Sequence, residues 1–96
     1  MKTVNFSLWM AGGDNVDWDC KVSNAAYDKL SKIPQEELWY VKLWELDEKT
    51  YNRVYAAASK EIYRSILENC DGDTDEADEE FEWIDWGFNI VSLASD

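Results

Sequence analysis

The sequence predicts an α+β fold in which helices pack on one face of a small antiparallel sheet. Three segments alternate apolar and polar residues, as strands with one buried face do. Two other segments repeat apolar residues every three or four positions, as amphipathic helices do. The expected order is strand, strand, helix, an uncertain segment, helix, strand. The 96 residues suffice for one core, so residues 1–96 are expected to form a single domain.

The first two strands are expected to pair as a hairpin. The apolar positions of the first are Val4, Phe6, Leu8 and Met10. Those of the second are Val16, Trp18, Cys20 and Val22. Between them, Gly12, Gly13, Asp14 and Asn15 supply the residue types that tight turns require.

A first helix is expected to follow at Ser23, a favoured N-cap residue, and to end before Pro34. A second and longer helix is expected from Asp47 to Asn69, with Gly72 suited to its C-terminal cap. Its apolar stripe consists of Tyr51, Val54, Tyr55, Ala58, Ile62, Ile66 and Leu67.

Residues 35–46 fit two structures. A helix would begin at Pro34 and place Glu36 and Glu37 in a favourable first turn. A strand would place Leu38, Tyr40, Trp44 and Leu46 on one face. The aromatic and β-branched content slightly favours an extended segment.

The last strand is expected near the C-terminus, beside the first strand. Ile84, Trp86, Phe88 and Ile90 form its apolar side, alternating with Asp85, Gly87 and Asn89. The segment before it, residues 71–82, holds eight carboxylates in twelve positions and is expected to be an acidic loop.

Negative charge is concentrated at one end of the chain. The net charge is −12, and residues 71–96 hold ten acidic residues and no Lys or Arg. Such charge disfavours direct binding to nucleic acid or an anionic membrane, and it favours a basic protein partner, a cation or simple solubility. No apolar stretch approaches the roughly 20 residues that span a bilayer, and the N-terminus lacks the pattern of a secretory signal. A soluble cytoplasmic protein is therefore expected.

The composition argues against an enzyme and against a cofactor. The chain has no histidine, no phosphate-binding glycine motif and no nucleophile motif. Cys20 and Cys70 stand fifty residues apart, too few ligands for a zinc site, and are expected to be reduced thiols.

The acidic segment also has an EF-hand-like spacing. Loop positions 1, 3, 5, 7, 9 and 12 would be Asp71, Asp73, Asp75, Ala77, Glu79 and Glu82. Glu76 stands where the turn glycine belongs, and Asp78 stands where an apolar residue is usual. Calcium binding is therefore an alternative, beside a segment that only aids solubility.

The main hypothesis is a partner-binding surface that joins the acidic segment to the uncovered face of the sheet. Asp17, Asp19 and Asp85 are expected to project from this face, along with Trp9 and Trp83. Exposed tryptophans beside carboxylates are typical of interface anchors. The expected contact residues are Asp17, Asp19, Asp73, Asp75, Glu76, Asp78, Glu79, Glu80, Glu82, Trp83, Asp85 and Trp9.

In composition the chain resembles small acidic phage-encoded inhibitors, namely the anti-CRISPR proteins and other DNA mimics, and the immunity proteins that neutralise nuclease toxins. The likeness is carried by the run from Asp71 to Asp85 and by Asp17 and Asp19. The resemblance implies an inhibitor that binds a basic nucleic-acid-handling effector or nuclease and blocks access of nucleic acid. The protein itself is expected to be non-enzymatic and to be a monomer or a homodimer. The remaining alternative is a structural or oligomerising interaction domain.

Overall fold

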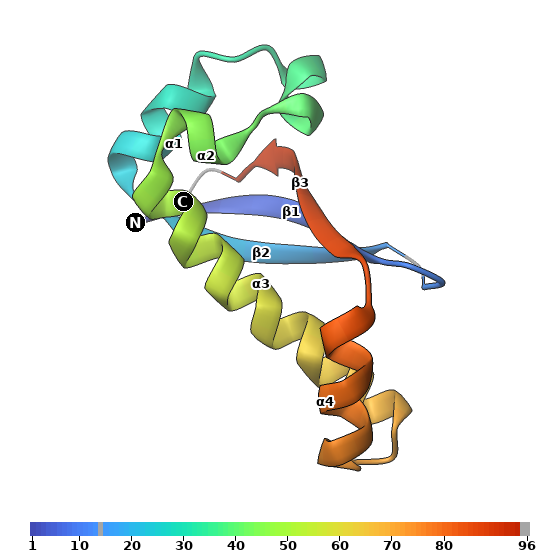
Figure 1. Cartoon of the computed structure of the whole chain (residues 1–96). Coiled ribbons are helices and arrows are strands. Elements are labelled where there is room, and N and C mark those ends of the chain that lie inside the picture. The colour runs from blue at the N-terminus through green and yellow to red at the C-terminus, as the bar shows by residue number, and fades with distance from the viewer. Residues whose placement is uncertain (14, 95–96) are drawn as a thin grey trace.

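The computed structural model describes residues 1–13 and 15–94 and has the expected α+β architecture, with a three-stranded antiparallel sheet and helices on one of its faces (Figure 1). The elements are β1 (Lys2–Met10), β2 (Val16–Val22), α1 (Asn24–Ser31), the 3₁₀ helix η1 (Gln35–Tyr40), α2 (Leu43–Leu46), α3 (Glu48–Asn69), α4 (Thr74–Trp83) and β3 (Trp86–Leu93).

β1 is the central strand, in the order β2-β1-β3, and pairs antiparallel with both neighbours. The predicted hairpin and the predicted place of the last strand beside the first are both confirmed. Phe6 lies opposite Trp18 on β2 and opposite Ile90 on β3. Gly12 has a φ of 80°, a conformation that glycine adopts without strain. Asp14, which belongs to the predicted turn, lies outside the described residues.

β3 keeps the predicted alternation and then changes register. Phe88 and Ile90 lie opposite Leu8 and Phe6, but the next pair joins Asn5 to Ser92, so Val91 is an extra residue of a bulge. The bulge places Leu93 opposite Val4, where it packs on the core. The strand begins at Trp86, two residues later than predicted, because Ile84 is the C-cap of α4.

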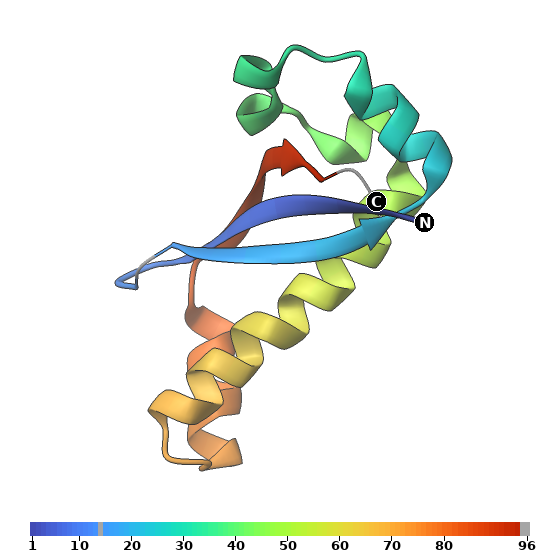
Figure 2. The same cartoon turned by 180° about the vertical axis from the view of Figure 1, so that it is seen from behind.

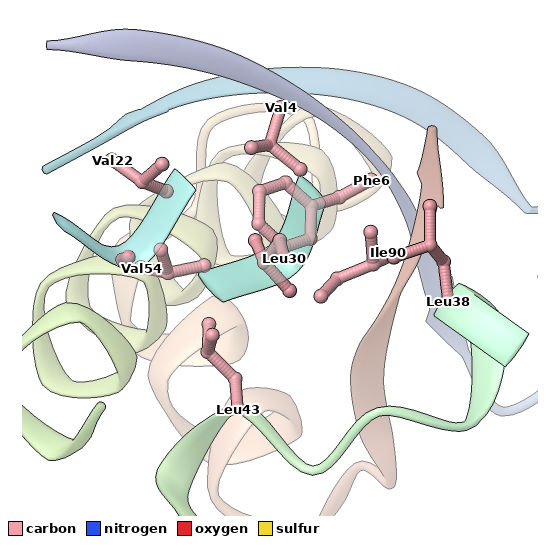
Figure 3. Close-up of a cluster of buried hydrophobic side chains, with 9 residues drawn as sticks. Val4, Phe6, Val22, Leu30, Leu38, Leu43, Val54 and Ile90 are labelled. Atoms are coloured by element: carbon pink, nitrogen blue, oxygen red, sulfur yellow. The ribbon is translucent and has the colours of Figure 1, made fainter. Parts of the chain in front are cut away.

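The main core lies between the sheet and the helices (Figure 3). Phe6 is fully buried at its centre, and its ring packs against Trp18 and Phe88 with centroids 5.7 Å apart in each case. The labelled side chains converge from the sheet, α1, η1, α2 and α3. They are Val4, Phe6, Val22, Leu30, Leu38, Leu43, Val54 and Ile90.

The two predicted helices begin at the predicted caps. The Ser23 hydroxyl accepts a hydrogen bond from the backbone N–H of Ala26, and an Asp47 carboxylate oxygen accepts one from the N–H of Thr50. On the predicted stripe of α3, Tyr55 is 45% exposed, because it lies at the stripe's edge. Among the described residues, no helix is both long and apolar enough to cross a membrane.

Residues 35–46 form η1 and α2, so the prediction of an extended segment is wrong. Leu38 and Leu43 are both buried, each projecting from its own short helical turn, with an extended Val41 between the turns. η1 also bonds to β3: the Gln35 side chain donates to the Val91 carbonyl, and the Asn89 side chain donates to the Trp39 carbonyl. These tertiary contacts outweigh the intrinsic preference of the aromatic residues for a strand.

Candidate acidic interaction surface

The acidic segment is mainly the helix α4, so the prediction of a loop at 71–82 is wrong. The Asp73 carboxylate caps the helix by accepting hydrogen bonds from the N–H groups of Asp75 and Glu76. Ala77 and Phe81, four residues apart, present an apolar edge to the rest of the molecule. Capping, burial and carboxylates in the first turn favour the helix, and together they outweigh the repulsion between like charges.

A tight reversal at residues 70–73 lays α4 against the second half of α3. Asp71 has a φ of 52° and Gly72 a φ of 82°. The N–H of Gly72 donates to the Leu67 carbonyl over 2.9 Å, as in a Schellman motif. Figures 1 and 2 show the result: the end of α3 and α4 project together beyond the sheet.

A second, smaller core holds this helix pair together. Ile62, Ile66 and Cys70 of the α3 side pack with Ala77 of α4. The ring of Phe81 lies edge-on to that of Tyr63, with centroids 5.7 Å apart. The acidic helix therefore has a fixed place on the protein.

Two side chains of the α3 side bind carboxylates of α4. The hydroxyl of Tyr63 donates to Asp78, and the thiol of Cys70 donates to Glu80 with Sγ and Oε2 3.4 Å apart. Neither contact was predicted from the sequence, although Tyr63 and Cys70 stand seven residues apart and so lie on the same side of α3 and its C-cap. The spacing of Tyr63 and Cys70 would have indicated the side of α3 on which the next helix packs, if residues 74–83 had been predicted as a helix.

The pKa values of these two groups respond to the acidic helix. Burial raises the pKa of the Cys70 thiol to about 11, with further contributions from the hydrogen bond to Glu80 and from nearby carboxylates. The hydrogen bond to Asp78 is the main cause of the raised pKa of Tyr63. Both shifts are those expected beside concentrated negative charge, which disfavours a further anion.

The outward side of α4 carries four of the segment's eight carboxylates. Asp75, Glu76, Glu79 and Glu82 are exposed, and Trp83 at the end of the helix is 79% exposed. Their spacing of three, four and seven residues places them on the side opposite Ala77. The helix contains no Lys or Arg that could neutralise them.

The predicted sheet-face carboxylates lie elsewhere. Asp17 and Asp19 are exposed on β2, and Asp19 accepts a hydrogen bond from the Asn5 side chain at 3.0 Å. β2 is separated from β3, which continues from α4, by the whole width of β1. Two strand spacings are about 9–10 Å, so this pair is distinct from the α4 cluster.

Of three further predicted contact residues, two do not lie on the sheet. Trp83 belongs to α4 and Asp85 to the connection before β3, so neither projects from the sheet. Trp9 does lie on β1, but its ring folds over Gly87 of β3 and remains 37% exposed. The structure thus places Asp75, Glu76, Glu79, Glu82 and Trp83 together on the outward side of α4, whereas Asp78 and Glu80 bind side chains of the α3 side. It leaves Asp17, Asp19, Asp85 and Trp9 outside this surface.

The EF-hand-like spacing does not produce a calcium-binding loop. From Thr74 onward the segment is helical, so Ala77 faces α3 while Asp75 and Glu79 face outward. The predicted ligands Asp71, Asp73, Asp75, Ala77, Glu79 and Glu82 therefore do not surround a common point. Within residues 1–13 and 15–94, no three His, Cys, Asp or Glu side chains are placed to hold a metal ion.

No family model matches the chain, and neither a curated protein nor a solved structure shows significant similarity to it. Its geometry and chemistry are therefore the basis for any function assigned to it.

Proposed function

We propose that this protein is an inhibitor that binds a basic surface of a nucleic-acid-handling protein through α4 and so excludes nucleic acid from that surface. The observation that carries the proposal is the charge density of α4. Six carboxylates fall within the ten residues of α4. At about 1.5 Å of rise per residue these ten residues span about 15 Å, or one negative charge per about 2.5 Å. Duplex DNA carries one per about 1.7 Å of its axis.

A fixed line of charge suits this role better than a mobile one. α4 is capped by Asp73 and packed on α3, so its outward carboxylates need little ordering when a partner binds. Ordering a mobile segment would cost conformational entropy at the moment of association. The helix therefore supports both affinity and a defined register against the partner.

Trp83 supplies the apolar part of the surface. It is the most exposed tryptophan of the described chain and follows Glu82 directly. Large aromatic side chains that become buried in an interface often carry much of the binding free energy, whereas charged residues at the rim mainly govern association rate and salt dependence. We expect Trp83 to anchor the complex and the carboxylates to steer it.

The test is a competition experiment with two charge-matched variants. One changes Asp75→Asn, Glu76→Gln, Glu79→Gln and Glu82→Gln. The control changes four exposed acids elsewhere, Asp28→Asn, Glu36→Gln, Glu37→Gln and Glu45→Gln. Both have the same net charge, so a difference between them reports the position of the charge. Circular dichroism would show whether α4 persists in each.

A basic protein retained by the wild-type chain would be purified, and its binding to a short labelled DNA duplex followed by fluorescence anisotropy. The wild type and the control should displace the duplex at a ratio of one protein per partner, less effectively as salt is added. The α4 variant should be at least tenfold weaker. Simultaneous binding of the duplex and this protein, or equal competition by the α4 variant, would contradict the proposal.

A further inference from the structure

A pocket of about 440 Å³ lies between β3, α3 and the segment formed by η1 and α2. Its volume is in the range of pockets that hold small molecules. Aromatic rings from β1, η1, α2, α3 and β3 form most of its walls. The principal ones are Trp9, Trp39, Trp44, Tyr51, Tyr55 and Trp86.

The rings contact one another in a row, and those of Trp44 and Tyr55 keep part of their surface exposed. Trp44 and Tyr51 stand nearly perpendicular, with an interplanar angle of 75° and centroids 5.6 Å apart. The ring centroid of Tyr55 lies 5.9 Å from that of Tyr51 and 5.0 Å from that of Trp86, so these rings form a continuous row along the pocket. Trp44 is 53% exposed and Tyr55 is 45% exposed, so neither ring is fully used in packing the core.

The lining contains almost no charge. Lys42 is its one charged side chain, and Lys42 is exposed to solvent; the lining includes no Asp, Glu, His or Cys. Acid–base chemistry and metal binding are therefore poorly served there. Beside the Lys42 ammonium and the Asn89 amide, the groups available to a ligand are the aromatic rings, whose faces carry the negative part of the quadrupole and attract cations.

The charge of the whole molecule points the same way. With a net charge of −12, the protein lowers the local concentration of anions and raises that of cations around it. An uncharged apolar ligand would gain nothing from this field, and an anion would be repelled by it. The combination of exposed aromatic ring surface and a negatively charged molecule favours an organic cation.

We propose that this pocket binds a small organic cation of the alkylammonium class, held by the faces of Trp44, Tyr51, Tyr55 and Trp86. The site is separate from the outward side of α4, and the proposal does not depend on the function proposed for that helix. Cation–π contacts are strongest where the cation is removed from water. A cation between the nearly perpendicular rings of Trp44 and Tyr51 would lose part of its hydration shell.

Choline is a suitable probe, compared with its uncharged isostere in which a tert-butyl group replaces the trimethylammonium group. Binding would be followed by NMR shifts of the Trp and Tyr side chains, with sodium chloride used to equalise ionic strength. Choline should bind about 2- to 30-fold more tightly than the isostere, the range expected of cation–π contacts. Equal affinity for both would overturn the proposal, because the pocket would then select only apolar shape. Absence of choline binding would overturn it as well.

Variants assign the effect to the pocket. Trp44→Ala and Tyr55→Leu should weaken choline binding several-fold, whereas Tyr55→Phe, which keeps the ring, should preserve it. Trp83→Ala removes an exposed tryptophan outside the pocket and should have no effect. Circular dichroism of each variant separates loss of the site from loss of the fold. If Trp83→Ala weakened choline binding as much as Trp44→Ala did, the site would not be this pocket.

Discussion

Gly87 lies where the ring of Trp9 crosses from β1 onto β3. A Cβ atom at this position would stand 2.6 Å from Cζ2 and 2.8 Å from Cε2 of Trp9, too close for any side chain. We expect Gly87→Ala to lower the free energy of unfolding by about 1–3 kcal/mol, the usual cost of overpacking, measured by urea denaturation. Gly13→Ala is the control, because its nearest neighbour is the flexible end of Met10 at 3.4 Å.

The same pair allows a double-mutant cycle. In a Trp9→Ala background the ring is gone, and Gly87→Ala should then cost little. If Gly87→Ala were equally costly in both backgrounds, the contact with Trp9 would not be its cause. The alternation of β1 predicted the side of the sheet on which Trp9 lies. The alternation did not predict that the Trp9 ring lies over Gly87, because that contact depends on the pairing of β1 with β3.

Cys70 makes the stability of the protein depend on pH at the alkaline end. Its pKa in the folded chain is about 11, against an ordinary 9.0. Between these two values the unfolded chain releases the thiol proton while the folded chain keeps it, so the free energy of unfolding must fall as pH rises from about 9 to about 11. Below pH 9 the contribution is fully present.

Cys70→Ser tests this contribution, because a serine hydroxyl can still donate to Glu80 but does not titrate in this range. We expect its unfolding free energy, measured by urea denaturation at a series of pH values, to decline less steeply above pH 9 than that of the wild type. Parallel curves for the two proteins would show that Cys70 does not supply the pH dependence. Tyr63, whose pKa is also raised, remains in both proteins.

At the scale of single elements, the clearest test is the cap of α4. Asp73→Ala removes the acceptor for the N–H groups of Asp75 and Glu76, and we expect a loss of about 1 kcal/mol in the free energy of unfolding. Amide hydrogen exchange should also quicken in the first turn of α4. Asp85→Ala removes an exposed carboxylate that caps no helix and serves as the control. Equal loss in both variants would assign the effect to charge alone.

The elements that local patterns could predict were those with a strong period or a clear cap. The alternation in β1, β2 and β3, Ser23 before α1 and Asp47 before α3 all depend on nearby residues. α4 also has local signals, in Asp73 and in the spacing of Ala77 and Phe81, but the density of like charge suggested a loop. η1 could not be predicted in this way, because its contacts with β3 join residues about fifty positions apart.

At the scale of the whole molecule, the place of the charge was predictable and its arrangement was not. Counting acidic residues identified residues 71–85 directly. Whether Asp17 and Asp19 would join that cluster depended on the sheet order, which sets them on the far edge strand. The aromatic pocket could not be predicted, because Trp39 and Trp44 reach it from η1 and α2, and residues 35–46 fitted two structures at the level of sequence.

The uneven charge gives a final prediction about salt. Crowded carboxylates on α4 repel one another in the folded state, and at about 10 mM salt the Debye length of roughly 30 Å leaves this repulsion unscreened. Adding sodium chloride should therefore raise the unfolding free energy of the wild type. Glu79→Gln with Glu82→Gln relieves repulsion in the second half of α4, where the helix dipole also disfavours acids. This pair should stabilise the protein at low salt and reduce its response to added salt.

Glu36→Gln with Glu37→Gln changes the net charge by the same amount at the start of η1, away from the crowded helix. Urea denaturation of both double variants at about 10 mM and about 500 mM sodium chloride separates local from overall charge, since the Debye length falls several-fold between these conditions. The η1 pair should keep most of the wild-type salt response, because the carboxylates of α4 remain. If both pairs reduced that response equally, only the total charge of the protein would matter, and the concentration of charge on α4 would have no energetic consequence for the fold.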